Sequence, residues 1–397
     1  MACASAIAGV VASAPAASAG GREQSTQLVS RTAGGSLPDG PSTNAVISGD
    51  RRYASVIAFE SEASNLVGGD GNGAKDVFVV KRAGRYGNNG SRWSPARTRL
   101  VSRGGGGPAN GPSFSPAVDG SFTSRASCVA FLSQASNLVA GDTNGKVDAF
   151  VSRGPGGAPS RVSTPGGDQA GQDTTDVAVS GDCRRIAFVT GGSLYVRVGR
   201  KVTSLGAGVD PSWSTGKAGD SDLVYTGTSG VLLSNGGTAK GRLVAPGGRN
   251  PAYNNIKRKV VAYEKQAGGR TQVLWHDLGG RERAASGSRG SLGDADSREP
   301  VIGNSGFYIA FESDASNLQT NAGGARSDDN GTADVYLFTD ARDITLLESV
   351  EEKGQALPGG GANPSMSFYA NYIVWDSPAP LGSAGPRQVY LRYLGAV

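Results

Sequence analysis

Histidine, cysteine and methionine are scarce in this sequence: its 397 residues include one His, three Cys and two Met. A metal site built from several imidazoles is therefore excluded, and a Ser/His/Asp or Cys/His catalytic group would need His276 as its base. No G-x-S-x-G nucleophile motif accompanies this residue. We interpret His276 as a structural residue on a strand, and the scarcity of imidazole favours a binding protein over an enzyme.

Charge of one sign and long apolar runs are limited as well. The 39 Lys and Arg residues against 34 Asp and Glu give a net charge of +5, without a run of five or more basic residues. No apolar stretch reaches the length needed to cross a bilayer. We therefore expect a globular monomer with neither a nucleic-acid partner nor a transmembrane segment.

Glycine, by contrast, is abundant, with 62 residues. This is roughly twice its ordinary share, and glycine lowers helix stability by roughly 0.5–1 kcal/mol relative to alanine. The residues AVILMFWYC make up 38% of the chain, which is enough to form a core. The composition therefore disfavours a helical protein.

The first residues resemble an export signal. Residues 6–12 read AIAGVVA, and the small-residue pattern Ala17-Ser18-Ala19 precedes Gly20 as at a signal-peptide cleavage site. No Lys or Arg precedes the apolar stretch, so the alternatives are a signal peptide without its basic front end and an Ala-rich tail. We expect residues 1–19 to be a signal peptide and residues 20–397 to form one domain, secreted or held in the cell envelope.

A short apolar run that ends in an aromatic residue occurs seven times. The spacing between these runs varies, which fits a repeated core with loops of different length and not a helical solenoid of fixed period. The aromatic residues are Phe59, Phe131, Phe188, Tyr225, Tyr263, Phe311 and Trp375.

Each run lies between further strand-like segments. The segment before it often opens with Pro, as at Pro112 and Pro211, and the segment after it often opens with Asp, as at Asp76 and Asp334. A weaker fourth run closes the unit. Four short strands separated by Gly-rich turns are the content of one propeller blade. The sequence therefore predicts an all-β fold, a seven-bladed β-propeller of four-stranded antiparallel blades.

The two ends of the chain carry complementary parts of a blade. The last repeat stops after its third strand, whereas residues 26–31 (TQLVSR) precede the first repeat and differ at one position from the closing run 98–103 (TRLVSR). A ring sealed by its own ends leaves this pattern and removes exposed sheet edges. We predict that an N-terminal strand completes the last blade; the alternative is a pair of β-sandwiches.

The succession of Pro-x-Ser, Ile-Ala-Phe and Asp-Val-Phe/Tyr strands resembles the TolB-like propeller repeat, a relative of the WD repeat. Three repeats also share an S-x-A-S-N-L segment, at residues 61–66, 133–138 and 313–318. The resemblance covers about residues 26–397 and implies an exported or envelope-associated binding scaffold. The Gly-His signature of WD repeats is absent.

Two cysteines, Cys128 and Cys183, remain if the chain is cleaved after Ala19. An exported protein would meet an oxidising compartment, where disulfides form. A disulfide between these neighbouring repeats and two buried thiols both stay open, because sequence does not report the Cα separation that a bridge requires.

The motif D-x-N-G-x-x-D lies between the second and third strands of three repeats. Alternating oxygen side chains followed by a further carboxylate resemble a calcium loop, although the spacing is not that of an EF-hand. The alternative is an Asn-Gly hairpin turn in which each Asp caps a bend. The candidate calcium ligands are Asp70, Asn72, Asp76, Asp142, Asn144, Asp148, Asp328, Asn330 and Asp334.

The sequence assigns no catalytic residue and no certain cofactor, and calcium is the one candidate. We expect a non-catalytic scaffold that binds a protein or glycan partner at one rim or at the axial channel, because loops from all blades converge on one face of a rigid ring. The alternative is a propeller-class hydrolase or lyase that uses loop carboxylates, for which no pair can be named.

Overall fold

The computed structural model describes residues 24–397 apart from residues 52, 85–91, 155, 215–220, 257, 289, 304–305, 319–327, 351–355, 380–384 and 396–397. The expected signal peptide, residues 1–19, lies outside the described residues. The described part consists of strands, turns and one short 3-10 helix, η1 (Asn235–Gly237). None of its helical structure is long and apolar enough to span a bilayer.

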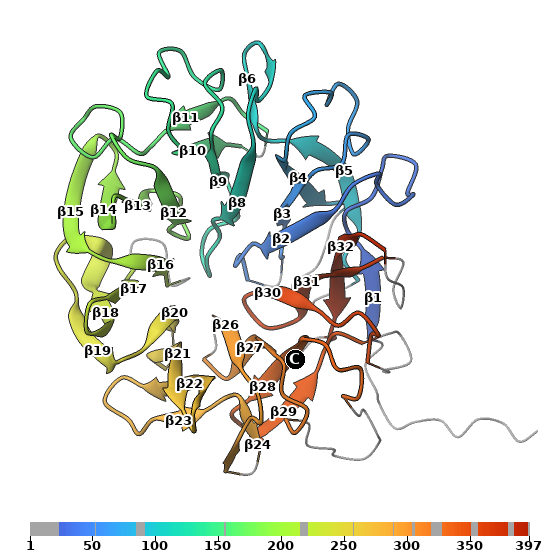
Figure 1. Ribbon diagram of the computed structural model, residues 1–397, viewed down its shortest axis with the longest axis vertical. Coiled ribbons are helices and arrows are strands. Elements are labelled where there is room, and N and C mark those ends of the chain that lie inside the picture. Colours follow the sequence, from blue (N-terminus) through green and yellow to red (C-terminus); the bar gives the residue numbers. More distant parts are fainter. Residues whose placement is uncertain are drawn as a thin grey trace, which may run out of the picture.

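Seven four-stranded antiparallel sheets surround a common axis like the blades of a propeller (Figure 1). Blade 1 contains β2 (Ser42–Ile47), β3 (Val56–Ser61), β4 (Asp76–Arg82) and β5 (Pro95–Leu100). Blade 2 contains β8 (Ser113–Val118), β9 (Cys128–Ser133), β10 (Asp148–Arg153) and β11 (Pro159–Arg161). Blade 3 contains β12 (Thr174–Val179), β13 (Arg185–Thr190), β14 (Ser193–Val198) and β15 (Lys201–Ala207). Blade 4 contains β16 (Val209–Trp213), β17 (Leu223–Gly227), β18 (Gly230–Ser234) and β19 (Arg242–Pro246).

The remaining blades follow the same order from the axis outward. Blade 5 contains β20 (Arg249–Asn254), β21 (Val260–Ala267), β22 (Arg270–Asp277) and β23 (Arg283–Ala284). Blade 6 contains β26 (Ser297–Ile302), β27 (Tyr308–Ser313), β28 (Asp334–Thr339) and β29 (Ile344–Leu347). Blade 7 contains β30 (Ala362–Met366), β31 (Tyr372–Pro378), β32 (Arg387–Tyr393) and, outermost, β1 (Ser25–Leu28). Two small hairpins, β6 (Arg103–Gly104) with β7 (Gly107–Pro108) and β24 (Gly287–Ser288) with β25 (Ser291–Leu292), decorate the loops.

Blade 7 takes its outermost strand from the other end of the chain. β1 pairs antiparallel with β32, and Thr26 lies opposite Arg392. The Arg392 side chain is 1% exposed; it donates to Glu348 at 2.8 Å and also to Thr26 and Gln24. The predicted seven-bladed ring, closed by its own N-terminal strand, is therefore confirmed.

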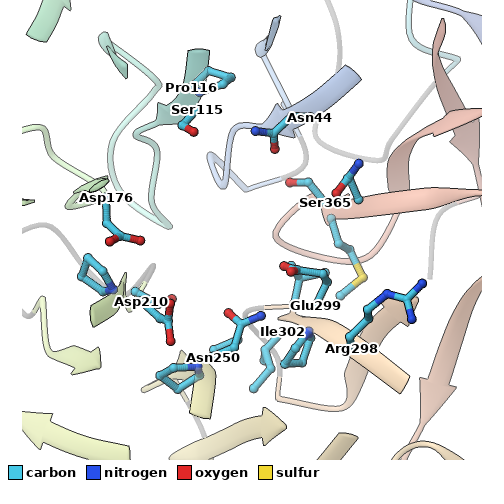
Figure 2. Close-up of a pocket in the computed structure, with 18 of the residues that line it drawn as sticks. Asn44, Ser115, Pro116, Asp176, Asp210, Asn250, Arg298, Glu299, Ile302 and Ser365 are labelled. Atoms are coloured by element: carbon cyan, nitrogen blue, oxygen red, sulfur yellow. The ribbon is translucent and has the colours of Figure 1, made fainter. Parts of the chain in front are cut away.

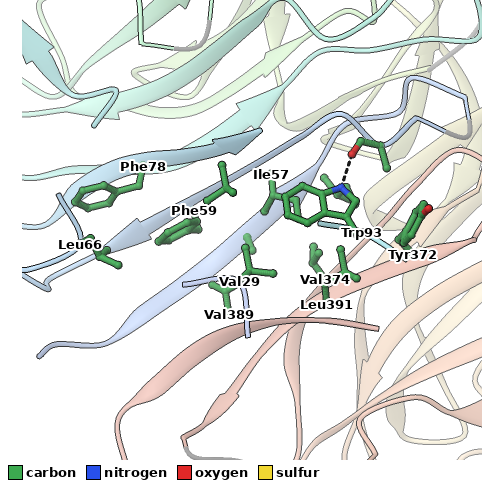
Figure 3. Close-up of a cluster of buried hydrophobic side chains, with 14 of the residues drawn as sticks. Val29, Ile57, Phe59, Leu66, Phe78, Trp93, Tyr372, Val374, Val389 and Leu391 are labelled. Carbon is green, nitrogen blue, oxygen red and sulfur yellow. Dashed lines mark hydrogen bonds between the residues drawn. The ribbon is translucent and has the colours of Figure 1, made fainter. Parts of the chain in front are cut away.

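Apolar side chains fill the spaces between neighbouring blades. Every residue of β3 is buried, which explains a continuous apolar run where a half-exposed strand would alternate. The aromatic residue on the second strand stacks on one from the third: the Phe59 and Phe78 ring centroids lie 5.8 Å apart. Figure 3 shows the seam between blades 1 and 7, where the buried Trp93 donates its Nε1 to the Ala54 carbonyl at 2.6 Å. This packing holds the blades rigidly around the axis.

The innermost strand of every blade pairs irregularly with the second strand. The register shifts between Thr43 and Val46 in blade 1 and between Phe114 and Ala117 in blade 2. It shifts at the matching point of the other five blades as well. A bulge of this kind leaves a residue unpaired and redirects its side chain. The seven bulges place one polar residue per blade beside the axis.

Candidate functional site: the axial channel

A polar cavity of about 1180 Å³ occupies the axis of the ring, lined by the innermost strands of all seven blades. Figure 2 shows polar side chains from different blades facing its open centre. A cavity of this size is large enough for a small ligand or for a side chain or sugar presented by a larger partner.

Seven residues at the bulges surround this cavity and form what we call the channel ring; in blade 3 the unpaired residue is Thr175, and the ring member is its neighbour Asp176, which pairs with Val189. Six of them have a positive φ of 45–54°, the exception being Asp176. Residues other than glycine adopt this conformation rarely, and such strain persists where the surroundings impose it, often at functional sites. The members are Asn44, Ser115, Asp176, Asp210, Asn250, Glu299 and Asn363.

Five members of the ring are held by the neighbouring blade. The residue that follows the aromatic residue on the second strand accepts the backbone N–H of the ring residue in the next blade. Glu60 accepts from Ser115 at 2.9 Å, and Glu264 accepts from Glu299 at 3.0 Å. The remaining bonds run from Asn250 to Thr226, from Asn363 to Glu312 and from Asn44 to Asp376. We call these five ring residues, together with the second-strand side chains that accept from them, the closed wall.

The pattern is interrupted after blades 2 and 3. The corresponding second-strand residues there are Leu132 and Val189, whose side chains accept no hydrogen bond. The next ring residues, Asp176 and Asp210, form what we call the open wall. The Asp176 carboxylate accepts from Thr175 Oγ1 at 2.6 Å, and the Asp210 carboxylate accepts from Thr226 Oγ1 at 2.8 Å.

Each arginine that lines the cavity pairs with an acid of a second strand. These contacts compensate the acids of the closed wall. The pairs are Arg249 with Glu264, Arg298 with Glu312 and Arg387 with Asp376.

Three ring carboxylates, on Asp176, Asp210 and Glu299, form no ion pair within the described part of the chain. Burial raises the pKa of Asp176, and the nearby Asp210 charge raises it further. Burial likewise raises the pKa of Glu299, although a hydrogen bond from Asn250 opposes the shift. The channel therefore presents hydrogen-bond acceptors and three carboxyl groups that have no ion pair among the described residues.

The D-x-N-G-x-x-D residues do not line this cavity. In blade 1, Asn72 Nδ2 donates to Asp76 at 2.5 Å and to the Ala109 carbonyl at 2.9 Å, just before the next blade. The Asp76 carboxylate also accepts from Ser102, which follows β5 of the same blade. The same set of bonds recurs around Asn144 and Asp148 in blade 2 and around Asn330 and Asp334 in blade 6.

Blades 5 and 7 make the equivalent bonds with a single glutamine. Gln272 Oε1 accepts from Ser286 while its Nε2 donates to the Ala295 carbonyl. Gln388 is bonded in the same way to Ser30 and Gly40. The Asn and the second Asp of each motif thus tie neighbouring blades together, and the Asn presents nitrogen, not oxygen, to that Asp. Calcium at these motifs stays a prediction.

The first Asp of each motif lies outside this tie. Asp70, Asp142 and Asp328 each lie beside the second Asp of their own motif, and burial raises the pKa of all three. The groups that face them differ between blades.

Cys128 and Cys183 are joined in a disulfide with a Cα separation of 6.2 Å. It links β9 of blade 2 to the turn before β13 of blade 3. The Asp119 carboxylate lies near both sulfurs, a grouping that would suit a metal ion if the thiols were free. Because the thiolate is the metal ligand and the sulfurs are bonded to each other, we assign no metal to this group.

His276 lies on β22, away from the residues that line the cavity. Its Nδ1 is 2.8 Å from the Asp277 carbonyl, and its ring packs edge-on against Tyr263 with centroids 5.7 Å apart. Through these contacts the imidazole packs within blade 5.

The channel ring and its acceptors were not among the residues predicted from sequence. The acceptors have a simple signal, since each directly follows the aromatic residue of a repeat: Glu60, Glu264, Glu312 and Asp376. The ring residues precede a proline in five blades, but their types alternate among Asn, Ser, Asp and Glu. No single motif marks them, and the bulge that turns them inward appears only in three dimensions.

Neither a protein-family model nor a curated protein sequence matches the chain. Among solved structures, an oligogalacturonate lyase in complex with manganese is similar, with 10% identity and a TM-score of 0.51 over 94% of this chain and 97% of that chain. An acylaminoacyl peptidase from Pyrococcus horikoshii has 10% identity and a TM-score of 0.50 over 89% of this chain and 51% of that chain. A putative TolB from Agrobacterium tumefaciens has 14% identity and a TM-score of 0.40 over 75% and 93%. At these identities the likeness is one of fold: the chain is a β-propeller, with a TolB protein among its structural neighbours.

Proposed function

We propose that the protein is a non-catalytic scaffold that binds a protein or glycan partner at the axial channel. The channel ring carries this proposal, because seven hydrogen-bonding side chains from seven blades converge on one cavity of about 1180 Å³. The blades hold these side chains in place before the partner arrives. Little conformational freedom is then lost on binding.

The chemistry of the ring indicates which groups of the partner enter the channel. The carboxylates of Asp176, Asp210 and Glu299 have no ion-pair partner among the described residues. Lysine or arginine side chains of a protein, or hydroxyl groups of a glycan, donate hydrogen bonds to such oxygens. An apolar ligand would bury the carboxylates without compensation and is disfavoured.

Binding to a glycan array and to a panel of basic peptides tests the proposal. We expect the double variant Asp176→Asn/Asp210→Asn to weaken the binding found there by about 10- to 100-fold, because it replaces two charged acceptors with neutral ones and each exchange weakens a hydrogen bond by about 1 kcal/mol. Asp168→Asn is the matched control, since it removes an exposed carboxylate that does not line the channel. Equal binding by the double variant and the wild type would contradict a channel site, and silence on both panels would contradict the scaffold.

A propeller-class hydrolase or lyase is the second candidate. The raised pKa of Asp176 and Glu299 favours it, because carboxyl groups with raised pKa serve as general acids. The similar fold of a lyase in complex with manganese makes oligogalacturonate with added Mn²⁺ a first substrate to test. Product release that Glu299→Gln abolishes would support the enzyme over the scaffold.

We propose further that the protein works as a single-domain monomer outside the cytoplasm. The Cys128–Cys183 disulfide supports an oxidising location, and residues 1–19 carry the pattern of an export signal. N-terminal sequencing of the protein recovered from the producing cells, expected to begin at Gly20, tests the cleavage. Light scattering of the same material tests the monomer.

A further inference from the structure

We infer that blade 1 binds a calcium ion between Asp70 and Asp76, at a site independent of the channel. The motif D-x-N-G-x-x-D occurs in blades 1, 2 and 6, and its Asn and second Asp are used for the interblade tie. The first Asp is not needed for that tie, because blades 5 and 7 make it without one. The groups that contact the first Asp in each blade therefore indicate what the three sites bind.

In blade 2, a cationic side chain lies between the two carboxylates. Arg161 Nη1 is 2.9 Å from Asp142 Oδ1 and 3.3 Å from Asp148 Oδ2. It is also 2.8 Å from Gln169 Oε1. Three oxygen ligands around one positive group make this a cation site that the chain fills by itself.

In blade 6, a hydroxyl group contacts the first carboxylate of the motif instead of a guanidinium group. Tyr336 Oη donates a hydrogen bond to the Asp328 carboxylate. The burial of Asp334 raises its pKa to about 7, with the charge of Asp328 as a further cause. The tyrosine satisfies one carboxylate without bringing a positive charge.

Blade 1 has neither a cationic side chain nor a hydroxyl group at the corresponding strand positions. The strand pairing aligns Phe78 and Leu100 with Phe150 and Arg161 of blade 2 and with Tyr336 and Leu347 of blade 6. Neither Phe78 nor Leu100 can donate a hydrogen bond. The space that holds a guanidinium group in blade 2 thus has no donor from these two positions.

Asp70 is 9% exposed and, apart from the carboxyl group of the completely buried Asp76, has no donor or cation among the described residues. Burial and the charge of Asp76 raise the pKa of Asp70 to about 7, and Asp39 adds further negative charge. The Asp39 carboxylate itself accepts hydrogen bonds from the backbone N–H and the hydroxyl group of Ser64. Two buried carboxylates in contact repel each other unless a proton or a cation lies between them.

Calcium fits this pair better than a metal with strict geometry. It takes carboxylate ligands in flexible arrangements and completes its shell with carbonyl groups and water, whereas Mg²⁺ demands a near-ideal octahedron. Gly69 and Gly71, which flank Asp70, are exposed, so solvent lies next to the Asp70 side of the pair.

Thermal unfolding of the full-length protein, stripped with EDTA and measured at pH 7.5 with and without Ca²⁺, tests the site. We expect Ca²⁺ to raise the Tm of the wild type, because an ion that binds only the folded state stabilises it. Asp70→Asn should lose this rise. Leu100→Arg, which copies blade 2, should lose it as well, because the guanidinium group takes the place of the ion.

Asp142→Asn is the matched control: it changes the same motif position in blade 2 and should keep the full Ca²⁺ response. A wild-type Tm that ignores Ca²⁺, or a response that survives in Asp70→Asn, would overturn the inference. A Tm that rises as pH falls from about 8 to 6 without responding to Ca²⁺ would show that a proton, not calcium, joins the pair. Should Leu100→Arg fail to fold, calorimetric titration of Ca²⁺ into the wild type and Asp70→Asn decides, with binding expected in the first and not in the second.

Discussion

The closed and open walls of the channel connect neighbouring blades by different means. In the closed wall, second-strand acids such as Glu264 and Asp376 accept the backbone N–H of the next ring residue. The open wall lacks these acceptors; there the Cys128–Cys183 disulfide joins blade 2 to blade 3, and Trp213 Nε1 donates to a carbonyl of blade 3 at 3.2 Å. The second-strand acids of the closed wall are engaged in hydrogen bonds and ion pairs, whereas the ring carboxylates of the open wall form no ion pair among the described residues.

The largest effect is expected in the closed wall, from Asp376→Ala. Asp376 is fully buried, accepts from Asn44 and Asn363, and pairs with Arg387. Removing the carboxylate leaves several buried donors without an acceptor, so the free energy of unfolding should fall by about 3–5 kcal/mol. Urea denaturation measures this loss. Asp168→Ala, at an exposed site, should change stability by less than about 0.5 kcal/mol, and an equal loss in both variants would refute the structural role.

Breaking the covalent link of the open wall should cost less. The paired substitution Cys128→Ala/Cys183→Ala removes a crosslink that closes a loop of 55 residues in sequence separation. We expect a loss of about 2–4 kcal/mol in the free energy of unfolding. Adding a reductant to the wild type should reproduce the loss in denaturation curves, and a reductant-treated protein as stable as the oxidised one would show that blades 2 and 3 hold together without the bridge.

Asp176→Asn should stabilise the open wall at neutral pH. Its folded-state pKa is raised above the ordinary 3.8, so the folded protein holds a proton that the unfolded chain releases, and this group weakens the fold as pH rises through the raised pKa. The variant should therefore have a higher Tm than the wild type at pH 8, and the gap should close as pH approaches about 4. A Tm difference that is constant with pH, or a variant that is less stable than the wild type at pH 8, would contradict a destabilising charge on Asp176.

The smallest effect is expected from Val189→Thr, which gives blade 3 the hydroxyl group that Thr226 supplies in blade 4. The new group can accept the backbone N–H of Asp210, but burying it opposes the gain. We expect a net change within about 1 kcal/mol, towards stability. Calorimetric unfolding would resolve it, and a loss above about 2 kcal/mol would mean that the hydroxyl group finds no partner.

The repeats were readable in the sequence because each blade must place an aromatic residue at the same point of its buried second strand, as at Phe59 and Phe131. The closing strand was readable because residues 26–31 repeat the run at 98–103 almost unchanged. The channel ring could not be read from the sequence, because its members, such as Ser115 and Glu299, have the same position at a bulge but not the same residue type. The role of Asn72 was hidden for another reason: sequence does not say which end of an amide faces a carboxylate.

The pairing of β1 with β32 also governs the order in which the molecule can be made. The bond from Arg392 to Thr26 spans 366 residues, so the first strand stays without its partner until nearly the whole chain has emerged. Contacts this distant in sequence slow folding, and an unpaired strand edge invites association with other chains in the meantime. A protein sealed in this way has a vulnerable interval between the appearance of its first and last strands, and a chaperone that covers residues 25–28 during that interval would protect it.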